Sequence, residues 1–464
     1  MAGGLHASAT YSVPNPSSPD YSIQRACYVT PESVHRRSFL RLGGVAGAAL
    51  VSSPLGLVSA LAAQSPAPAP LPAWSPQRAA TSESFWRQVR ALYAPDPNFI
   101  DFDNANSGAC PTAVIDAYLR RARMLCAAPN VQYPRFLGGN VVHTPIAALL
   151  HTSIDELALV PNATQGLNTI LHGFPLARGD EVIVTNHEYP DMIETLTRRA
   201  KRDGLVIRTI AVPGADEDRL TLVARLRAAV TSRTKLLLVS HVSAWNSEIL
   251  PVAELCAEAR AHGVAVLVDA AQSVGYLDTP FSAWGCDFLA TSMHKGLGAP
   301  MATGALVIRK DWIGKVEALH PPTWDISKYP VDLYSWSGTA NEAAVATLPD
   351  AVAVQERIGL ARKRARLLHL ASEWRAMTRD IKGFRLLTPT TPDRTFGFSA
   401  FALDHVPSKL VAERLQKEFR ILVQDKASRP YRPFDNAVRV SPQPFASVAE
   451  LQRVATALRT IARG

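Results

Sequence analysis

Short apolar runs alternate with longer amphipathic stretches through the middle of the chain. The runs are rich in Val, Ile and Leu, whereas the stretches between them repeat apolar residues at helical spacing. Strands are expected at 157–160, 181–185, 206–211, 235–240, 264–268 and 288–290, and helices at 111–126, 163–172, 190–203, 220–230 and 254–262. Because strands buried on both faces form continuous apolar runs, this alternation predicts an α/β fold with a mostly parallel sheet flanked by helices.

The pattern changes after residue 340. Residues 342–379 are rich in Ala, Leu and Arg and predict long helical material. Expected strands at 395–402, 421–424 and 437–441 alternate with expected helices at 407–419 and 448–461, the last preceded by the capping-box spacing of Ser447 and Glu450. The chain therefore predicts a large domain at 100–335 and a smaller α+β domain at 340–464. Arg362, Arg364 and Arg366 are interpreted as a solvated helix face.

The amino-terminal region has a different composition. Residues 1–34 are rich in Ser, Pro and Tyr without periodicity, and we expect them to be disordered. Arg36 and Arg37 precede a weakly apolar stretch at 42–63 that ends on small residues, which resembles a twin-arginine signal peptide. Residues 1–63 thus predict export to the periplasm or the medium by the Tat machinery, or a membrane anchor if cleavage fails. The Pro/Ala-rich stretch at 64–80 is interpreted as a linker.

Composition excludes several classes of function. With 47% hydrophobic and 19% charged residues, the 464-residue chain is typical of a globular protein. The net charge of +9 is not gathered in a basic run with interleaved aromatics, so nucleic acid is not an expected partner. The five cysteines form no CxxC pair, so a zinc site or a disulfide framework has little support. No GxGxxG or P-loop motif follows any expected strand.

Candidate chemistry gathers at the carboxyl ends of the expected strands, where open α/β sheets bind ligands. Asp269 ends the run at 264–268, and Lys295 follows the run at 288–290 in a glycine-rich turn. A buried acid near a lysine is what pyridoxal 5′-phosphate chemistry requires, with the lysine forming the Schiff base and the acid keeping the pyridine nitrogen protonated. The alternative is an ordinary strand-end acid and a solvated lysine. Thr164 and Gln165, after the expected N-cap Asn162, suit a phosphate.

Taken together, these segments resemble the class V aminotransferase family of fold-type I pyridoxal phosphate enzymes, and within it the isopenicillin N epimerase-like branch. The resemblance extends over residues 100–464. It implies that Lys295 carries the cofactor, and that the cofactor site also contains Thr164, Gln165, Tyr189, His187, Asp269, Gln272, Ser292 and His294. Tyr189 is the first choice for stacking on the cofactor ring and His187 the second.

The same resemblance implies the substrate contacts and the assembly. Arg439 would bind the carboxylate of an amino-acid substrate with its guanidinium fork, and Asn106 is assigned to the same substrate site. Thr339 would close the active site of a partner subunit, which implies a homodimer.

The resemblance leaves the reaction open. It implies that Lys295 removes the proton on the substrate Cα, after which epimerisation, racemisation or transamination can follow. Tyr189 or His187 is a hypothetical second base for epimerisation. The alternatives are a C–S lyase or cysteine desulfurase-like enzyme, and a binding protein that has lost catalysis. Because no cysteine follows Cys286, persulfide-forming desulfuration has little support.

Overall fold

A central sheet positions most of the candidate residues. The computed structural model describes residues 70–138 and 140–463. Within them, seven strands form the sheet in the order β2-β8-β7-β6-β5-β3-β4. The strands are β2 (Leu157–Val160), β3 (Glu181–Thr185), β4 (Val206–Ile210), β5 (Thr234–Ser240), β6 (Ala265–Asp269), β7 (Phe288–Ser292) and β8 (Gly304–Ile308). Strand β8 is antiparallel to β2 and β7, and all other neighbours are parallel.

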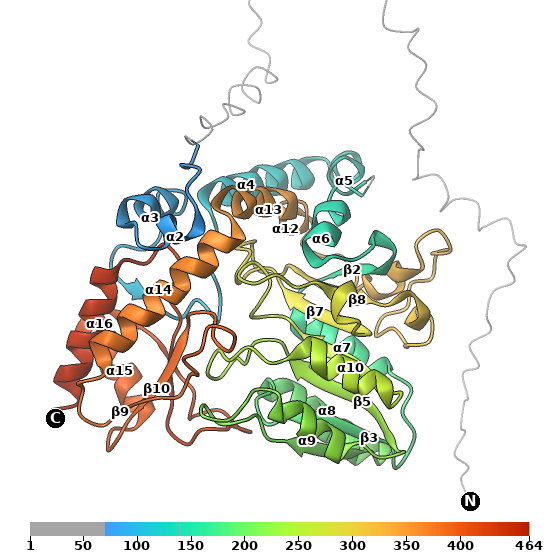
Figure 1. Cartoon of the computed structure of the whole chain (residues 1–464). Coiled ribbons are helices and arrows are strands. Elements are labelled where there is room, and N and C mark those ends of the chain that lie inside the picture. Colours follow the sequence, from blue (N-terminus) through green and yellow to red (C-terminus); the bar gives the residue numbers. More distant parts are fainter. Residues whose placement is uncertain (1–69, 139, 464) are drawn as a thin grey trace, which may run out of the picture. The chain divides into compact units, whose positions relative to one another are not determined.

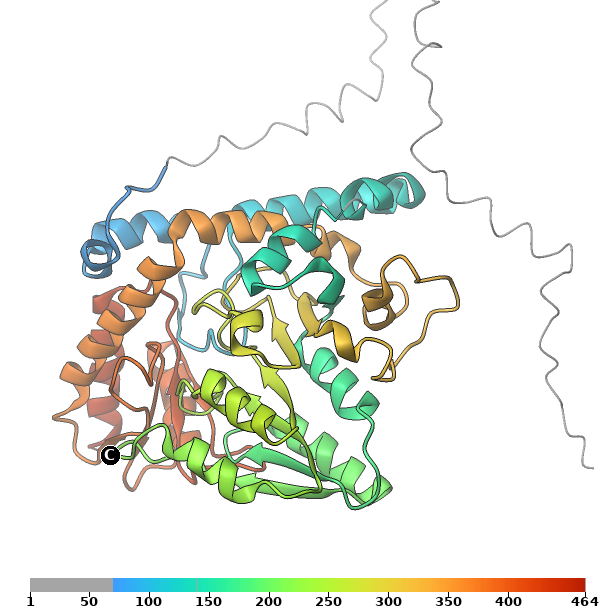
Figure 2. The same ribbon diagram turned by 45° about the vertical axis from the view of Figure 1, so that its right-hand side comes forward.

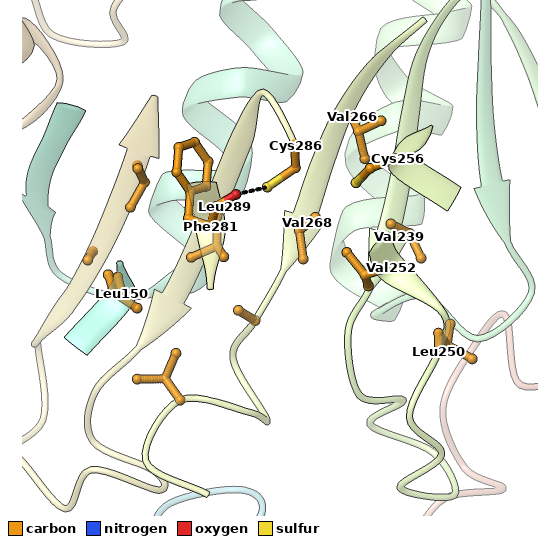
Figure 3. Packing of buried hydrophobic residues seen from close by; sticks show 14 of the residues in the cluster. Leu150, Val239, Leu250, Val252, Cys256, Val266, Val268, Phe281, Cys286 and Leu289 are labelled. Carbon is orange, nitrogen blue, oxygen red and sulfur yellow. Dashed lines mark hydrogen bonds between the residues drawn. The ribbon is translucent and has the colours of Figure 1, made fainter. Parts of the chain in front are cut away.

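Helices cover both faces of this sheet (Figures 1 and 2). On one face, α7 and α8 bury apolar side chains such as Ile170 and Leu196 against the strands, and α9 and α10 do so on the other. Figure 3 shows the second face, where Cys256 of α10 lies beside Val266 of β6 and Val252 of α10 lies beside Val239 of β5. The helices of this part are α4 (Thr112–Ala127), α5 (Pro129–Leu137), α6 (His143–Leu150), α7 (Ala163–Gly173), α8 (Pro190–Asp203), α9 (Thr221–Ala229), α10 (Val252–Ala261) and α11 (Phe281–Trp284). The expected α/β architecture is confirmed, with the alternating elements close to their predicted bounds.

A second, four-stranded antiparallel sheet lies in the carboxyl-terminal part of the described chain. Its order is β12-β13-β10-β9. The elements here are β9 (Phe384–Leu386), β10 (Ser399–Leu403), β11 (Ile421–Leu422), β12 (Gln424–Asp425), β13 (Val438–Val440), α12 (Glu342–Val345), α13 (Leu348–Ile358), α14 (Leu360–Thr378), α15 (Ser408–Phe419) and α16 (Val448–Ile461). The predicted capping box is present, because Ser447 and Glu450 bond each other's backbone N–H groups.

Two predicted elements in this part are divided. The helical stretch at 342–379 forms α12, α13 and α14, and Gly359 separates the last two with a φ of +89°, which glycine adopts readily. The expected strand at 421–424 forms β11 and β12, which belong to different sheets, because β11 pairs with β1 (Ile100–Asp101) and β12 pairs with β13. Periodicity in the sequence marks an extended run but does not identify its partner strand.

The amino-terminal segment packs against the carboxyl-terminal part. The interval predicted as a linker ends in helix α2 (Pro76–Ala80), which Ser75 caps and which lies against α14 beside α3 (Glu83–Arg90) (Figure 1). Arg366 was expected on a solvated face, yet it is fully buried and donates to the carbonyls of Ala80 and Ala446. The helix face carrying Arg366 is therefore covered by residues that precede the large domain in sequence.

The predicted signal peptide at 1–63 lies outside the described residues. In the part that is described, no helix is both long enough and apolar enough to cross a bilayer.

Candidate active site

The predicted acid and lysine lie together at the carboxyl edge of the central sheet. Asp269 is the last residue of β6 and pairs in register with Ala290 of β7, whereas Lys295 follows the end of β7. Asp269 is 8% exposed, and its Oδ1 accepts a hydrogen bond from the Ala271 N–H at 2.8 Å. Burial raises the pKa of Asp269, and the Ala271 N–H and the charge of Lys295 partly offset that rise.

Burial shifts the pKa of the Lys295 amine in the opposite direction. It lowers the pKa of Lys295 to about 8, although the negative charge of Asp269 works against this shift. A much larger fraction of Lys295 is therefore neutral near pH 7 than for an exposed lysine. A neutral amine is the form that attacks a carbonyl carbon, so this environment suits a nucleophilic lysine.

The amino terminus of α7 forms the second part of the site. Asn162 caps the helix by accepting from the Gln165 N–H at 2.9 Å, as expected. The Ser292 hydroxyl accepts from the Ala163 N–H at 2.9 Å, which joins the end of β7 to the start of α7. Thr164 is exposed on the first turn and Gln165 is partly buried. The first turn of this helix, with its N–H groups and its positive dipole end, suits a phosphate group.

His187 and Tyr189 follow β3 at the same edge. His187 is 5% exposed, its ring centroid lies 5.5 Å from that of Phe434, and burial lowers its pKa to about 3, so it is neutral at physiological pH. Tyr189 is partly buried at the N-cap of α8. Burial raises the pKa of Tyr189, the nearby Asp191 raises it further, and hydrogen bonding to Arg429 works in the opposite direction. Both predicted stacking candidates thus lie on the expected edge.

Gln272 and His294 connect the site to the segment before α4. The Gln272 side chain donates to the Ala105 carbonyl at 2.8 Å, and the His294 carbonyl accepts from the Gly108 N–H at 2.9 Å. A Cβ atom on Gly108 would lie 2.1 Å from the Lys295 carbonyl oxygen, so only glycine fits there. The approach of this segment to Lys295 depends on that missing side chain.

Arg439 lies on β13 and is 2% exposed. Its guanidinium donates to the Ala244 carbonyl at 2.7 Å and to Asp103 Oδ1 at 3.1 Å. Arg439 and Lys295 are close enough that the arginine charge also contributes to lowering the lysine pKa. The predicted substrate arginine therefore reaches the edge of the central sheet from the other sheet.

Two further predicted site residues are exposed rather than buried. Asn106 is exposed in the turn after Asp103, whereas Asn104 is 3% exposed and its side chain accepts from Gln443 and donates to the carbonyls of Asp101 and Ser441. Thr339 is exposed before α12, and no hydrogen bond joins it to the other candidate residues in the described part of this chain. The prediction was that Thr339 closes the active site of a partner subunit rather than that of its own chain.

Three buried ionisable residues of the site were not predicted. Glu188 bonds the Ser240 hydroxyl at 2.7 Å and the Thr185 hydroxyl at 2.6 Å, and burial raises its pKa to about 7. Lys426 is 4% exposed, and its Nζ lies 4.6 Å from the ring centroid of Trp245. The sequence signal for Glu188 was its place inside the His187–Tyr189 motif.

Lys363 of α14 is the third buried ionisable residue that was not predicted. Its ammonium group donates to the carbonyls of Gly275 and Gly296 and, at 2.7 Å, to Gln355 Oε1. Gly296 is the residue after Lys295, and Gly275 closes the segment that begins at Asp269. A Cβ on Gly275 would lie 2.4 Å from the Gly296 carbonyl carbon, so the two segments press together at this point. Lys363 therefore holds the turn that follows Lys295 against the segment that runs from Asp269 to Gly275.

The side chains at this edge fit a polar, anionic, ring-containing cofactor. In the described chain, several buried polar atoms have no hydrogen-bond partner, and four of them belong to predicted site residues: His187 Nδ1, Gln272 Oε1, His294 Nδ1 and Arg439 Nε. Buried polar atoms are nearly always bonded in native proteins, so these four are available for contacts with a ligand. With the α7 terminus, Asp269 and Lys295, the set matches the phosphate, ring nitrogen and aldehyde of pyridoxal 5′-phosphate.

Fold and site together define a fold-type I enzyme of pyridoxal phosphate chemistry, and the comparisons with known proteins assign its family. The family model described as Aminotransferase class-V matches residues 102–454. The chain therefore belongs to the class V aminotransferase family, whose members depend on pyridoxal 5′-phosphate and act on amino acids.

Its relatives include more than one activity. The chain is 28% identical over 393 residues to isopenicillin N epimerase of Streptomyces clavuligerus, a match that covers 80% of this chain and 97% of that protein. It is 28% identical over 287 residues to a probable cysteine desulfurase of Methanothermobacter thermautotrophicus, covering 60% and 70%. The solved structure of a cysteine desulfurase from Escherichia coli shares the fold, with a TM-score of 0.70 at 20% identity over 82% of this chain and 98% of that one.

Proposed function

We propose that this enzyme removes and returns the proton on the Cα of an amino acid, as an epimerase or racemase. The observation that carries the proposal is Lys295, whose pKa is lowered to about 8 beside Asp269 and within electrostatic reach of Arg439. The match to isopenicillin N epimerases over nearly the whole length of those proteins supports this choice. The absence of any cysteine after Cys286 argues against persulfide-forming desulfuration.

Each residue of the site has a task in this proposal. Bound pyridoxal 5′-phosphate supplies an electron sink that stabilises negative charge at Cα. Arg439 would bind the substrate α-carboxylate, and the amino terminus of α7 with Ser292 would hold the phosphate. Asp269 would hold the ring nitrogen, and Lys295 in its neutral form would accept the Cα proton. The partly buried Tyr189 is the candidate for returning a proton from the other face.

Solvent deuterium exchange tests this proposal. We expect the purified enzyme to incorporate deuterium at Cα of its amino-acid substrate and to convert one enantiomer into the other without forming a keto acid. Lys295→Ala should abolish both signals and the visible absorption of the bound cofactor. Keto-acid formation at the rate of substrate loss would show transamination instead, and racemisation at an undiminished rate in Tyr189→Phe would exclude Tyr189 as the second base.

The proposal includes a homodimer. Exposed apolar side chains lie on α4 and α5, where Leu119 is 47% exposed and Val131 is 70% exposed. Tyr118 of α4 accepts a hydrogen bond from Asn341, two residues after Thr339, so this face adjoins the loop assigned to a partner site. Light scattering should give twice the chain mass, and Leu119→Asp should give monomers. A wild-type chain that stays monomeric at high concentration would contradict this assembly.

The proposal also includes export. Arg36, Arg37 and the apolar stretch at 42–63 support transport by the Tat machinery to the periplasm or the medium. Exported, shortened protein should be lost when both arginines are replaced by lysine, as measured by cell fractionation. Unchanged export of that variant would refute the twin-arginine assignment.

A further inference from the structure

We propose that the amino-acid substrate carries a second anionic group on its side chain, which Lys426 and Arg429 bind. This inference rests on the proposed function, because it concerns the same site and names the class of substrate as acidic amino acids. It follows from the surroundings of Lys426, from the balance of charge around it, and from its contrast with Lys363.

Lys426 is fixed next to the substrate arginine. Its backbone N–H donates to the Ala437 carbonyl at 2.9 Å, which ties the residue after β12 to the start of β13, the strand that carries Arg439. Its side chain is 4% exposed, and Nζ lies 4.6 Å from the ring centroid of Trp245. Its position is therefore set by the sheet and an aromatic ring rather than by solvent.

The ammonium group of Lys426 has few partners of its own. Its hydrogen bond is to Gln424 Oε1, at 3.3 Å, and no carboxylate of the described chain lies within ion-pair distance. An ammonium group has three N–H donors. Lys363 is buried to the same degree but donates to three oxygen atoms, two carbonyls and the Gln355 side chain. Lys363 is thus internally satisfied, whereas Lys426 retains donors for a ligand.

Positive charge is in excess around Lys426. Burial is the main cause that lowers its pKa to about 6, and the charges of Arg439, Arg429 and Lys295 lower it further. Asp103 is the acid that acts in the other direction, and it is already bonded to Arg439 at 3.1 Å. Arg429 lies close enough to Tyr189 to influence its pKa, and Tyr189 is a neutral phenol at physiological pH. The α-carboxylate at Arg439 would balance one positive charge, which leaves Arg429, and Lys426 once it takes up a proton, for a second anion.

This arrangement predicts a measurable uptake of protons. A lysine with a pKa of about 6 is mostly neutral at pH 7, and an anion bound against it favours its charged form. Binding of a dicarboxylate to the holoenzyme at pH 7 should therefore take up close to one proton. Calorimetric titration with glutarate, in buffers of different ionisation enthalpy, measures this number directly, and butyrate serves as the monocarboxylate control.

Matched variants test the assignment. In Lys426→Met, glutarate should bind roughly 10-fold to 100-fold more weakly and without proton uptake, whereas butyrate affinity should be unchanged. Arg429→Gln should weaken glutarate binding in the same range and provides a second variant at a less buried position. Arg432→Gln is the control, because Arg432 lies in the same loop but pairs with Asp435.

Substrate kinetics give the second readout. KM for L-glutamate should rise in Lys426→Met and Arg429→Gln, while KM for L-norvaline stays unchanged. Equal losses for both amino acids, or a wild-type enzyme that binds glutarate no more tightly than butyrate, would overturn the inference. If no amino acid exchanges its Cα proton, the proposed function fails, yet glutarate titration still decides whether the second anion site exists.

Discussion

Lys363→Met is expected to change how the stability of the protein depends on pH. Lys363 is 3% exposed, and burial lowers its pKa to about 7 from the ordinary 10.5. Between these two values the unfolded chain binds more protons at this position than the folded one, so stability rises with pH across that window. The rise amounts to about 2 kcal/mol between pH 7 and pH 9, and the contribution is constant below pH 7.

A second effect of this substitution is independent of pH. Without the ammonium group, the carbonyls of Gly275 and Gly296 and the Gln355 Oε1 lose their donor. Each buried acceptor left unpaired costs about 1–3 kcal/mol, which opposes the gain from removing a buried charge. The net effect at pH 7 depends on these opposing terms, whereas the difference in pH slope between the two proteins depends on the pKa of Lys363 alone.

Urea unfolding of the apoprotein at pH 7, 8 and 9 measures this slope. Wild-type protein should gain about 2 kcal/mol relative to Lys363→Met over that range, because the other titrating groups are common to both. Lys409→Met, at an exposed lysine of α15, should run parallel to wild type. Parallel curves for Lys363→Met would refute the depressed pKa and show that the three oxygen atoms keep Lys363 charged.

Three further predictions follow from the site and its supports. Capture of pyridoxal 5′-phosphate by the apoprotein should speed up about tenfold from pH 6 to pH 7 and level off above the Lys295 pKa of about 8, and a rate still rising at pH 10 would contradict this. Ser447→Ala should lower the unfolding free energy by about 1 kcal/mol in urea titrations by removing the capping box of α16, whereas Ser447→Thr should keep it. Gly108→Ala should weaken cofactor retention in dialysis because its Cβ meets the Lys295 carbonyl, whereas Gly214→Ala, where the nearest atom is 3.4 Å away, should not.

The positions of Asn162, Asp269 and Lys295 were predictable because each depends on local chemistry. A polar residue before an amphipathic stretch caps a helix, and an acid after a buried apolar run lies at the carboxyl end of a strand. Parallel strands then place these ends at one edge, so the sheet brings together residues that are far apart in sequence. Arg439 could be assigned to the same edge only through the resemblance to the family, because nothing in the sequence of its own strand indicates contact with the central sheet.

Lys363 and Arg366 show what local reasoning could not provide. Both lie in a helix rich in arginine and lysine, a composition typical of a solvated face. Their burial arises because the segment at 70–111 packs on α14, and because Gly275 and Gly296 turn their carbonyls toward that helix. The cause of burial is thus long-range. Within the helix, Lys363 and Arg366 share a face with Leu367, Leu370 and Trp374, so helical spacing rather than residue type was the local signal.

The number of hydrogen-bond partners, rather than burial, distinguishes the buried cations with a structural role from those that face a ligand. Lys363 and Arg366 are buried and donate to several oxygen atoms of the protein, so removing either would leave acceptors without donors. Arg439 has two partners and a free Nε, and Lys426 has one acceptor at 3.3 Å. In the free protein, burial with so few partners lowers the pKa of Lys426 to about 6, and a bound anion would supply the compensating interaction for its charged form. The two under-bonded cations lie on either side of the link between β12 and β13, where an acidic substrate would contact both.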